Sequence, residues 1–201
     1  MFKGLNLSEK EILLLEDKDF LLTKSKVLDK IYQLLEITRN ELKEFAENSG
    51  FNFPEGMSLA TGKISKGENY KNLPYMVLDY PALFSAENVF AYRTMFWWGN
   101  FFSTTLHLEG TSLNRYRRIL SDNLVNLLNN KIYLGVGDLP WQYHYGKDNY
   151  VRLSKNHRDF IADCMFLKLS RKIQLKDWQM VPGFATDYFK LLLSSLRTRN
   201  D

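Results

Sequence analysis

The sequence predicts an α+β fold in which helices pack on an antiparallel sheet, and three observations support this prediction. Residues 89–110, VFAYRTMFWWGNFFSTTLHLEG, contain two apolar runs joined by Gly99-Asn100, a strong short-range signal of a β-hairpin. Residues 24–48 place apolar side chains at helical spacing, and a last apolar run opens with Pro182, where a helix tolerates proline. Because no linker, repeat or low-complexity tract interrupts the chain, we expect a single domain over residues 1–201.

Residues 1–50 form a predicted N-terminal helical part. Ser8 and Glu11 have the spacing of a capping box and predict a short helix start, after which residues 17–19 form a charged break. The longer helix is predicted from Lys24 to Asn48. Its apolar face consists of Leu28, Ile31, Leu35, Leu42 and Phe45.

Residues 51–110 form a predicted strand-rich part. We expect strands at residues 58–64 and 73–80, separated by a turn at residues 66–69, and then the hairpin. Large aromatic side chains occur on both faces of that hairpin, whereas a half-exposed sheet alternates apolar with polar residues. The hairpin is therefore predicted to be covered on both sides.

Residues 111–201 form a predicted mixed part of helices and strands. The expected helices cover residues 113–128, capped by Ser112, then a run from Ser154 or Asn156 to Leu169, and the last helix to about Leu196. Short strands are expected at residues 131–137, 150–153 and 171–178, with an aromatic loop at residues 138–149.

The register of the hairpin decides which side chains share a face. With a two-residue loop at Gly99-Asn100, the predicted pairs are Tyr92 with His107 and Thr94 with Thr105 on one face, and Arg93 with Leu106 on the other. The first face then mixes aromatic rings with converging polar groups, which is typical of a ligand pocket and makes Thr94 and Thr105 candidate ligand-binding residues. The alternative is a helix-covered sheet whose polar groups bond to one another or to the backbone.

Arg93 lies in the middle of a predicted strand, where an unpaired guanidinium is unfavourable to bury. We expect it to reach the surface at a sheet edge, to pair with Asp79 or Glu87, or to bind an anion in a bidentate manner. A structural ion pair is the favoured interpretation, and anion binding makes Arg93 a candidate ligand-binding residue.

The segment 139–146, LPWQYHYG, places four aromatic rings in five positions, which is unusual for a free loop. Three interpretations remain open: the rings close over the mixed hairpin face, they dock a second subunit, or they pack on their own domain. Trp141 and Tyr143 are accordingly candidate ligand-binding residues.

No catalytic or metal-binding motif is recognisable. His107, His144 and His157 do not stand at metal-ligand spacing, so we expect no metal and no cofactor. Cys164 is expected on an apolar helix face, as an inert thiol. His107, with Tyr92 opposite in the predicted register, is the one candidate general base, and no catalytic residue is assigned.

Charge and cysteine content limit the partners and the compartment. Residues 1–110 carry a net charge of −3 and residues 111–201 carry +7, but no dense run of Lys and Arg with exposed aromatic residues predicts a nucleic-acid partner. One cysteine, no apolar run of transmembrane length and no signal peptide predict a cytoplasmic protein without membrane association.

The segments KISKGENYKNLPYMVLDYP and FAYRTMFWWGNFFSTTLHLEG resemble a family of uncharacterised bacterial proteins, chiefly from Bacteroidetes. The resemblance is strongest over residues 60–110. It implies a shared fold and no activity, so no functional residue is transferred from it.

The sequence thus predicts a domain that binds a small molecule or a protein partner, a homodimer among the expected assemblies, without catalytic machinery. Two alternatives remain. One is an enzyme for a small anionic substrate that uses His107, Tyr92 and Arg93. The other is a weak nucleic-acid contact through the basic C-terminal half.

Overall fold

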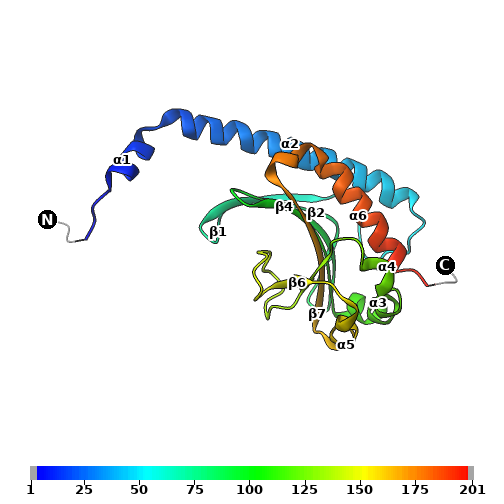
Figure 1. Ribbon diagram of the computed structural model, residues 1–201. Coiled ribbons are helices and arrows are strands. Elements are labelled where there is room, and N and C mark those ends of the chain that lie inside the picture. Colours follow the sequence, from blue (N-terminus) through cyan, green and yellow to red (C-terminus); the bar gives the residue numbers. More distant parts are fainter. Residues whose placement is uncertain (1–3, 199–201) are drawn as a thin grey trace.

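The computed structural model describes residues 4–198 and has the α+β architecture that the sequence predicts (Figure 1). Its strands form one sheet in the order β1-β2-β3-β4-β7-β5-β6, and all neighbouring strands are antiparallel. The strands are β1 (Lys63–Tyr70), β2 (Leu73–Phe84), β3 (Asn88–Trp97), β4 (Phe101–Glu109), β5 (Tyr133–Gly135), β6 (Tyr150–Arg152) and β7 (Phe166–Gln174).

Helices cover one face of this sheet, and the segment between β5 and β6 lies on the other face (Figure 1). The α-helices are α1 (Glu9–Glu16), α2 (Lys18–Asn48), α3 (Gly110–Asp122), α4 (Leu124–Leu127), α5 (Arg158–Asp163) and α6 (Val181–Ser195). Two 3₁₀-helices complete the fold, η1 (Lys155–His157) and η2 (Leu175–Met180).

The main core lies between the helices and the sheet. Leu35 and Leu42 of α2 and Phe189 of α6 are fully buried against Phe90 and Tyr92 of β3. A smaller apolar cluster lies on the opposite face, where Val77, Met95 and Trp97 of the sheet meet Tyr143 from the covering segment. Both faces of the β3–β4 hairpin are therefore buried, as the sequence predicts.

The predicted register of the hairpin is wrong by one residue. The turn contains Trp98 in addition to Gly99 and Asn100, so Trp97 pairs with Phe101. Trp98 leaves the hairpin ladder because its backbone N–H donates to the carbonyl of Pro74 in β2 (3.0 Å). A shift of one residue exchanges the faces of β4 relative to β3.

This shift changes the neighbours of the candidate residues. Arg93 pairs with Thr105, and Ala91 rather than Tyr92 pairs with His107. Thr94 pairs with Thr104 on the helix-covered face.

Two other expectations in the C-terminal part are correct only in part. The helix expected to reach Leu169 ends at Asp163, and strand β7 occupies residues 166–174. The apolar residues Phe160, Cys164 and Leu167 have helical spacing, but the alternation that follows has the period of a strand. The helix expected over residues 113–128 starts at Gly110 and is divided at Asn123, whose side-chain amide donates to the carbonyls of Ser195 and Arg197.

The N-terminal half contains a further correction. The turn expected at residues 66–69 lies inside β1, which pairs with β2 through an irregular register between Gly67 and Tyr70. Residues 58–62, expected as part of a strand, have no strand structure. The capping box of Ser8 and Glu11 and the end of the long helix at Asn48 are confirmed.

Candidate functional site

The sheet face opposite the helices carries a group of buried polar side chains, which we call the polar face. Its members come from three neighbouring strands and comprise Arg93 of β3, Thr105 and His107 of β4, and Lys168 and Ser170 of β7. The segment between β5 and β6, residues 136–149, covers them and is called the cover loop. Of the candidate residues from the sequence, Arg93, Thr105, His107, Trp141 and Tyr143 meet here.

Arg93 forms the predicted ion pair with Asp79 on the neighbouring strand β2. Its Nε donates to Oδ1 of Asp79 (2.7 Å) and one terminal nitrogen donates to Oδ2 (2.8 Å). The two side chains are only 17% and 8% exposed. Because this bidentate pairing occupies the guanidinium fork, Arg93 holds a carboxylate of its own chain rather than presenting the fork to a ligand.

The cover loop stacks its rings on Arg93. The guanidinium carbon lies 4.9 Å from the ring centre of Tyr143 and 5.8 Å from that of Trp141. Trp141 also contacts the ring of His107 edge to face, at 5.1 Å. Of the three interpretations of the aromatic segment, the structure thus shows packing over the hairpin of its own domain.

His107 is neutral near pH 7. Burial, aided by the positive charges of Lys168 and Arg93, lowers the pKa of His107 to about 3. The contact of 2.6 Å between its Nε2 and Oε1 of Glu109 is therefore a hydrogen bond donated by a neutral imidazole rather than an ion pair. Its Nδ1 has no hydrogen-bond partner among residues 4–198.

Lys168 is fully buried, although it has no carboxylate of the described residues within ion-pair distance. Its Nζ donates to the carbonyl of Gln142 (2.5 Å) in the cover loop. The rings of Tyr143 and Tyr150 lie 5.3 and 4.9 Å from this nitrogen. Burial and the charge of Arg93 lower the pKa of Lys168 to about 8.

Hydroxyl groups complete the contact between the polar face and the cover loop. Thr105 and Ser170 share a hydrogen bond of 2.6 Å, and the hydroxyl of Tyr145 bonds to the same Ser170 oxygen at 2.5 Å. Thr105 is therefore bonded within the protein, as the alternative interpretation of the mixed face expected.

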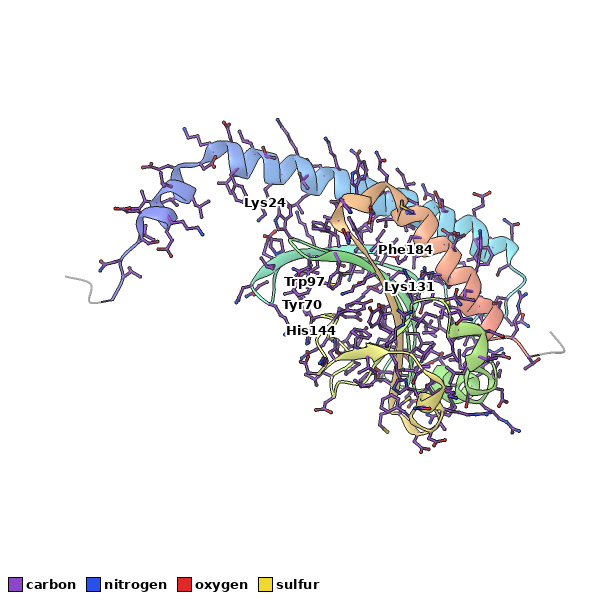
Figure 2. All side chains as sticks on the ribbon, viewed as in Figure 1. Lys24, Tyr70, Trp97, Lys131, His144 and Phe184 are labelled. Carbon is purple, nitrogen blue, oxygen red and sulfur yellow. The ribbon has the colours of Figure 1, made fainter. Side chains whose placement is uncertain are left out.

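Tyr70 of β1 fixes the far end of the cover loop. Its hydroxyl accepts hydrogen bonds from the backbone N–H groups of Tyr143 (2.7 Å) and His144 (3.0 Å), and lies 3.2 Å from Nδ1 of His144. Figure 2 shows Tyr70, Trp97 and His144 gathered beneath the sheet, and the indole of Trp97 donates to the carbonyl of Tyr70.

The predicted pair of Tyr92 and His107 is wrong. Tyr92 lies on the helix-covered face, where its hydroxyl donates to the carbonyl of Ala185 (2.7 Å). Thr94 lies on that same face, so neither residue reaches the polar face. The set of base, orienting tyrosine and anion clamp is divided between two sides of the sheet.

The pockets lie away from the polar face. None of the five pockets described for residues 4–198 is lined by Arg93, His107 or Lys168. The largest, of about 500 Å³, opens between α2, the tip of the β3–β4 hairpin and η2. We call it the apolar groove, and its lining residues are Val27, Lys30, Ile31, Phe96, Trp98, Gly99, Phe102, Leu175 and Trp178.

A second unusual surface lies at the N-terminus, in residues 5–22, which we call the arm. Figure 1 shows α1 and the first turns of α2 extending beyond the sheet. Helix α1 has no buried residue, and the first buried residue of α2 is Ile31. The large apolar residues exposed in the arm are Leu5, Leu7, Ile12, Leu13, Leu14, Leu15, Phe20, Leu21 and Leu22.

Sequence reasoning missed Lys168, Tyr70 and the apolar groove. Lys168 was missed because it was assigned to the helix expected to reach Leu169. Nothing in the sequence indicates that Tyr70 contacts a loop more than seventy residues away. The arm did leave a signal, because ILLLE and FLL contain more adjacent apolar residues than one face of a surface helix uses.

No protein-family model matches the chain, and no curated protein and no solved structure is significantly similar to it. The resemblance over residues 60–110 therefore stays a prediction.

Among residues 4–198, no group of three or more His, Cys, Asp or Glu side chains is placed to hold a metal ion. In the same residues, no helix is both long and apolar enough to cross a membrane.

Proposed function

We propose that this chain is a binding domain without catalytic machinery, and that the apolar groove holds an apolar helical segment of a protein partner. The observation that supports this most is the groove itself. Three separate segments wall it, and Lys30 is the only charged residue that residues 4–198 contribute to its lining. Exposed apolar surface bounded by polar residues is typical of an interaction site.

The shape of the groove favours a protein segment over a small molecule. Pockets for small ligands usually enclose most of the ligand. This groove is partly open to solvent and is bordered by Trp98 and Trp178, the second of which is 43% exposed. An amphipathic helix that lays its apolar side chains into such a groove is a common mode of peptide recognition.

The packing of the polar face also argues against catalysis at that face. Arg93 is paired with Asp79, and Glu109 accepts the hydrogen bond of His107. The cover loop lies over both groups. A substrate would have to displace this loop before it reached either residue.

A titration of methyl resonances tests this proposal. Helical leucine-rich peptides with acidic, neutral or basic polar faces are added to the ¹³C-methyl-labelled chain. We expect at least one peptide to shift the methyl signals of Val27, Ile31 and Leu175 in a saturable manner, while those of Val125, exposed on α4, stay unchanged. If no peptide shifts the groove signals, or if Trp178→Asp leaves the affinity within twofold, the proposal is wrong.

The compartment that we propose is the cytoplasm, because Cys164, the one cysteine of the sequence, can form no intrachain disulfide and suits a reducing environment. Recovery of the protein mainly from an extracellular or periplasmic fraction would contradict this part of the proposal.

A further inference from the structure

One turn of α1 is apolar around its whole circumference, so one flat contact cannot cover it. Ile12, Leu13, Leu14 and Leu15 are consecutive in α1, and four consecutive residues complete a helical turn. They are between 42% and 72% exposed. Exposed apolar side chains on every side of one helical turn are normally covered by another protein surface.

We infer that two copies of this chain exchange their arms, and that each arm lies in the apolar groove of the other copy. This inference rests on the proposed function, because it names the occupant of the groove. It is carried by two apolar surfaces of one chain, both without a partner among residues 4–198.

Helix α1 of the arm does not fold back onto the groove of its own chain. Only Asp17 separates α1 from α2, whereas two antiparallel helices need a connection of about 2–5 residues. Helix α2 is continuous from Lys18 to the groove residue Val27, a rise of about 14 Å that carries α1 away from the groove. The arm therefore stays exposed to solvent in a single copy and is accessible to a second copy.

The charges favour this partner over a lipid surface. Residues 8–22 contain five acidic and two basic side chains, so an anionic membrane repels the arm. The charged residue of the groove is Lys30, and the sequence as a whole is positive. An acidic apolar arm and an apolar groove with a basic edge complement each other.

Reciprocal exchange also closes the assembly. Two copies related by a twofold axis form the same contact twice and leave neither arm nor groove open. Each copy contributes the 18 residues of its arm and the nine lining residues of its groove, and these 27 residues together fall within the roughly 20–30 residues per side of a stable interface.

Sedimentation of the full chain tests the exchange. We expect the wild-type chain to have twice its mass of 23.7 kDa at micromolar concentration. Leu13→Glu/Leu15→Glu, which alters the arm, and Trp178→Asp, which alters the groove, should each weaken the dimer at least tenfold. The control Val125→Glu, at an exposed apolar residue of α4, should leave it unchanged. A mixture of the arm variant with the groove variant should again form dimers, because one intact arm then meets one intact groove.

Disulfide trapping provides a second readout that does not depend on loss of assembly. In a Cys164→Ser background, one chain carries Leu13→Cys and a second carries Leu175→Cys. Oxidation should join the two chains covalently, and neither variant alone should form this product.

A wild-type monomer, a dimer that survives Trp178→Asp, or the absence of the mixed disulfide overturns the exchange. If the wild-type chain is monomeric while helical peptides still shift the groove methyl signals, the exchange is wrong and the groove serves another partner. If the peptides also fail, the proposed function is wrong as well.

Discussion

Arg93 and Asp79 show how strongly one buried pair constrains the sheet. Each side chain satisfies the other through two hydrogen bonds, and each would be left with an uncompensated charge if its partner were removed. The sequence predicted this pair because an arginine in the middle of a covered strand needs a carboxylate nearby. The sequence did not predict which β4 residue lies opposite Arg93, because this depends on the length of the turn between β3 and β4.

The first prediction concerns this ion pair. Asp79→Asn should lower the free energy of unfolding by about 3 kcal/mol, since it leaves Arg93 buried without a counter-charge. Urea denaturation measures the change. The double variant Asp79→Leu/Arg93→Met should recover most of the loss, and a single variant within about 0.5 kcal/mol of wild type would contradict the assigned role.

The second prediction concerns His107 and acid. Its pKa is about 3 in the folded protein and near 6.5 in the unfolded chain, so the unfolded chain binds the proton first. The stability associated with the neutral ring is present above pH 6.5 and is lost as the pH falls towards 3, by about 5 kcal/mol in total. Carboxylates titrate in the same range, so the quantity to measure is the difference between wild type and His107→Gln in urea denaturation from pH 7 to pH 4. The same slope in both proteins would refute the assignment.

At the scale of elements, the cover loop and its anchors decide what the polar face can do. Tyr70 holds the loop through two backbone N–H groups, and Lys168 holds it through the carbonyl of Gln142. Both anchors lie outside the loop, on β1 and β7. The sequence of the loop alone therefore predicted that its aromatic rings are packed, but it did not predict the surface on which they pack.

The third prediction tests the Tyr70 anchor. Tyr70→Phe removes an acceptor from two N–H groups and should destabilise the protein by about 2 kcal/mol. Proteolysis should then cut first within the cover loop, residues 136–149. Tyr32→Phe, at a half-exposed tyrosine of α2, is the matched control. Equal cleavage in both variants would show that the loop is held by other contacts.

Local patterns predicted some elements and failed at others for physical reasons. The long helix, the last helix and the hairpin carry strong local signals in their spacing, in Pro182 and in Gly99, whose φ of +70° suits a glycine in the turn. The first part of strand β7 was expected as helix because Phe160, Cys164 and Leu167 fit a helical period, so the expected strand began only at Arg171. The hairpin register was missed because Trp98 bonds to β2, a contact between segments that no local pattern contains.

At the scale of the whole molecule, apolar surface is distributed unevenly. The sheet is closed by helices on one face and by the cover loop on the other, yet the arm and the apolar groove remain open. Monomeric proteins rarely leave contiguous apolar surface of this kind exposed. The arm carries a net negative charge and the groove has Lys30 at its edge, so the two surfaces are opposite in charge.

Hydrogen–deuterium exchange at two protein concentrations tests the central claim, that a second copy covers the arm, most directly. We expect the amides of residues 12–22 to be protected at high micromolar concentration and to exchange rapidly at low nanomolar concentration, with a parallel change at Trp98 and Trp178. Amides in β3 and β4 should show the same protection at both concentrations. Rapid exchange of residues 12–22 at every concentration, or protection that does not depend on concentration, would contradict the claim.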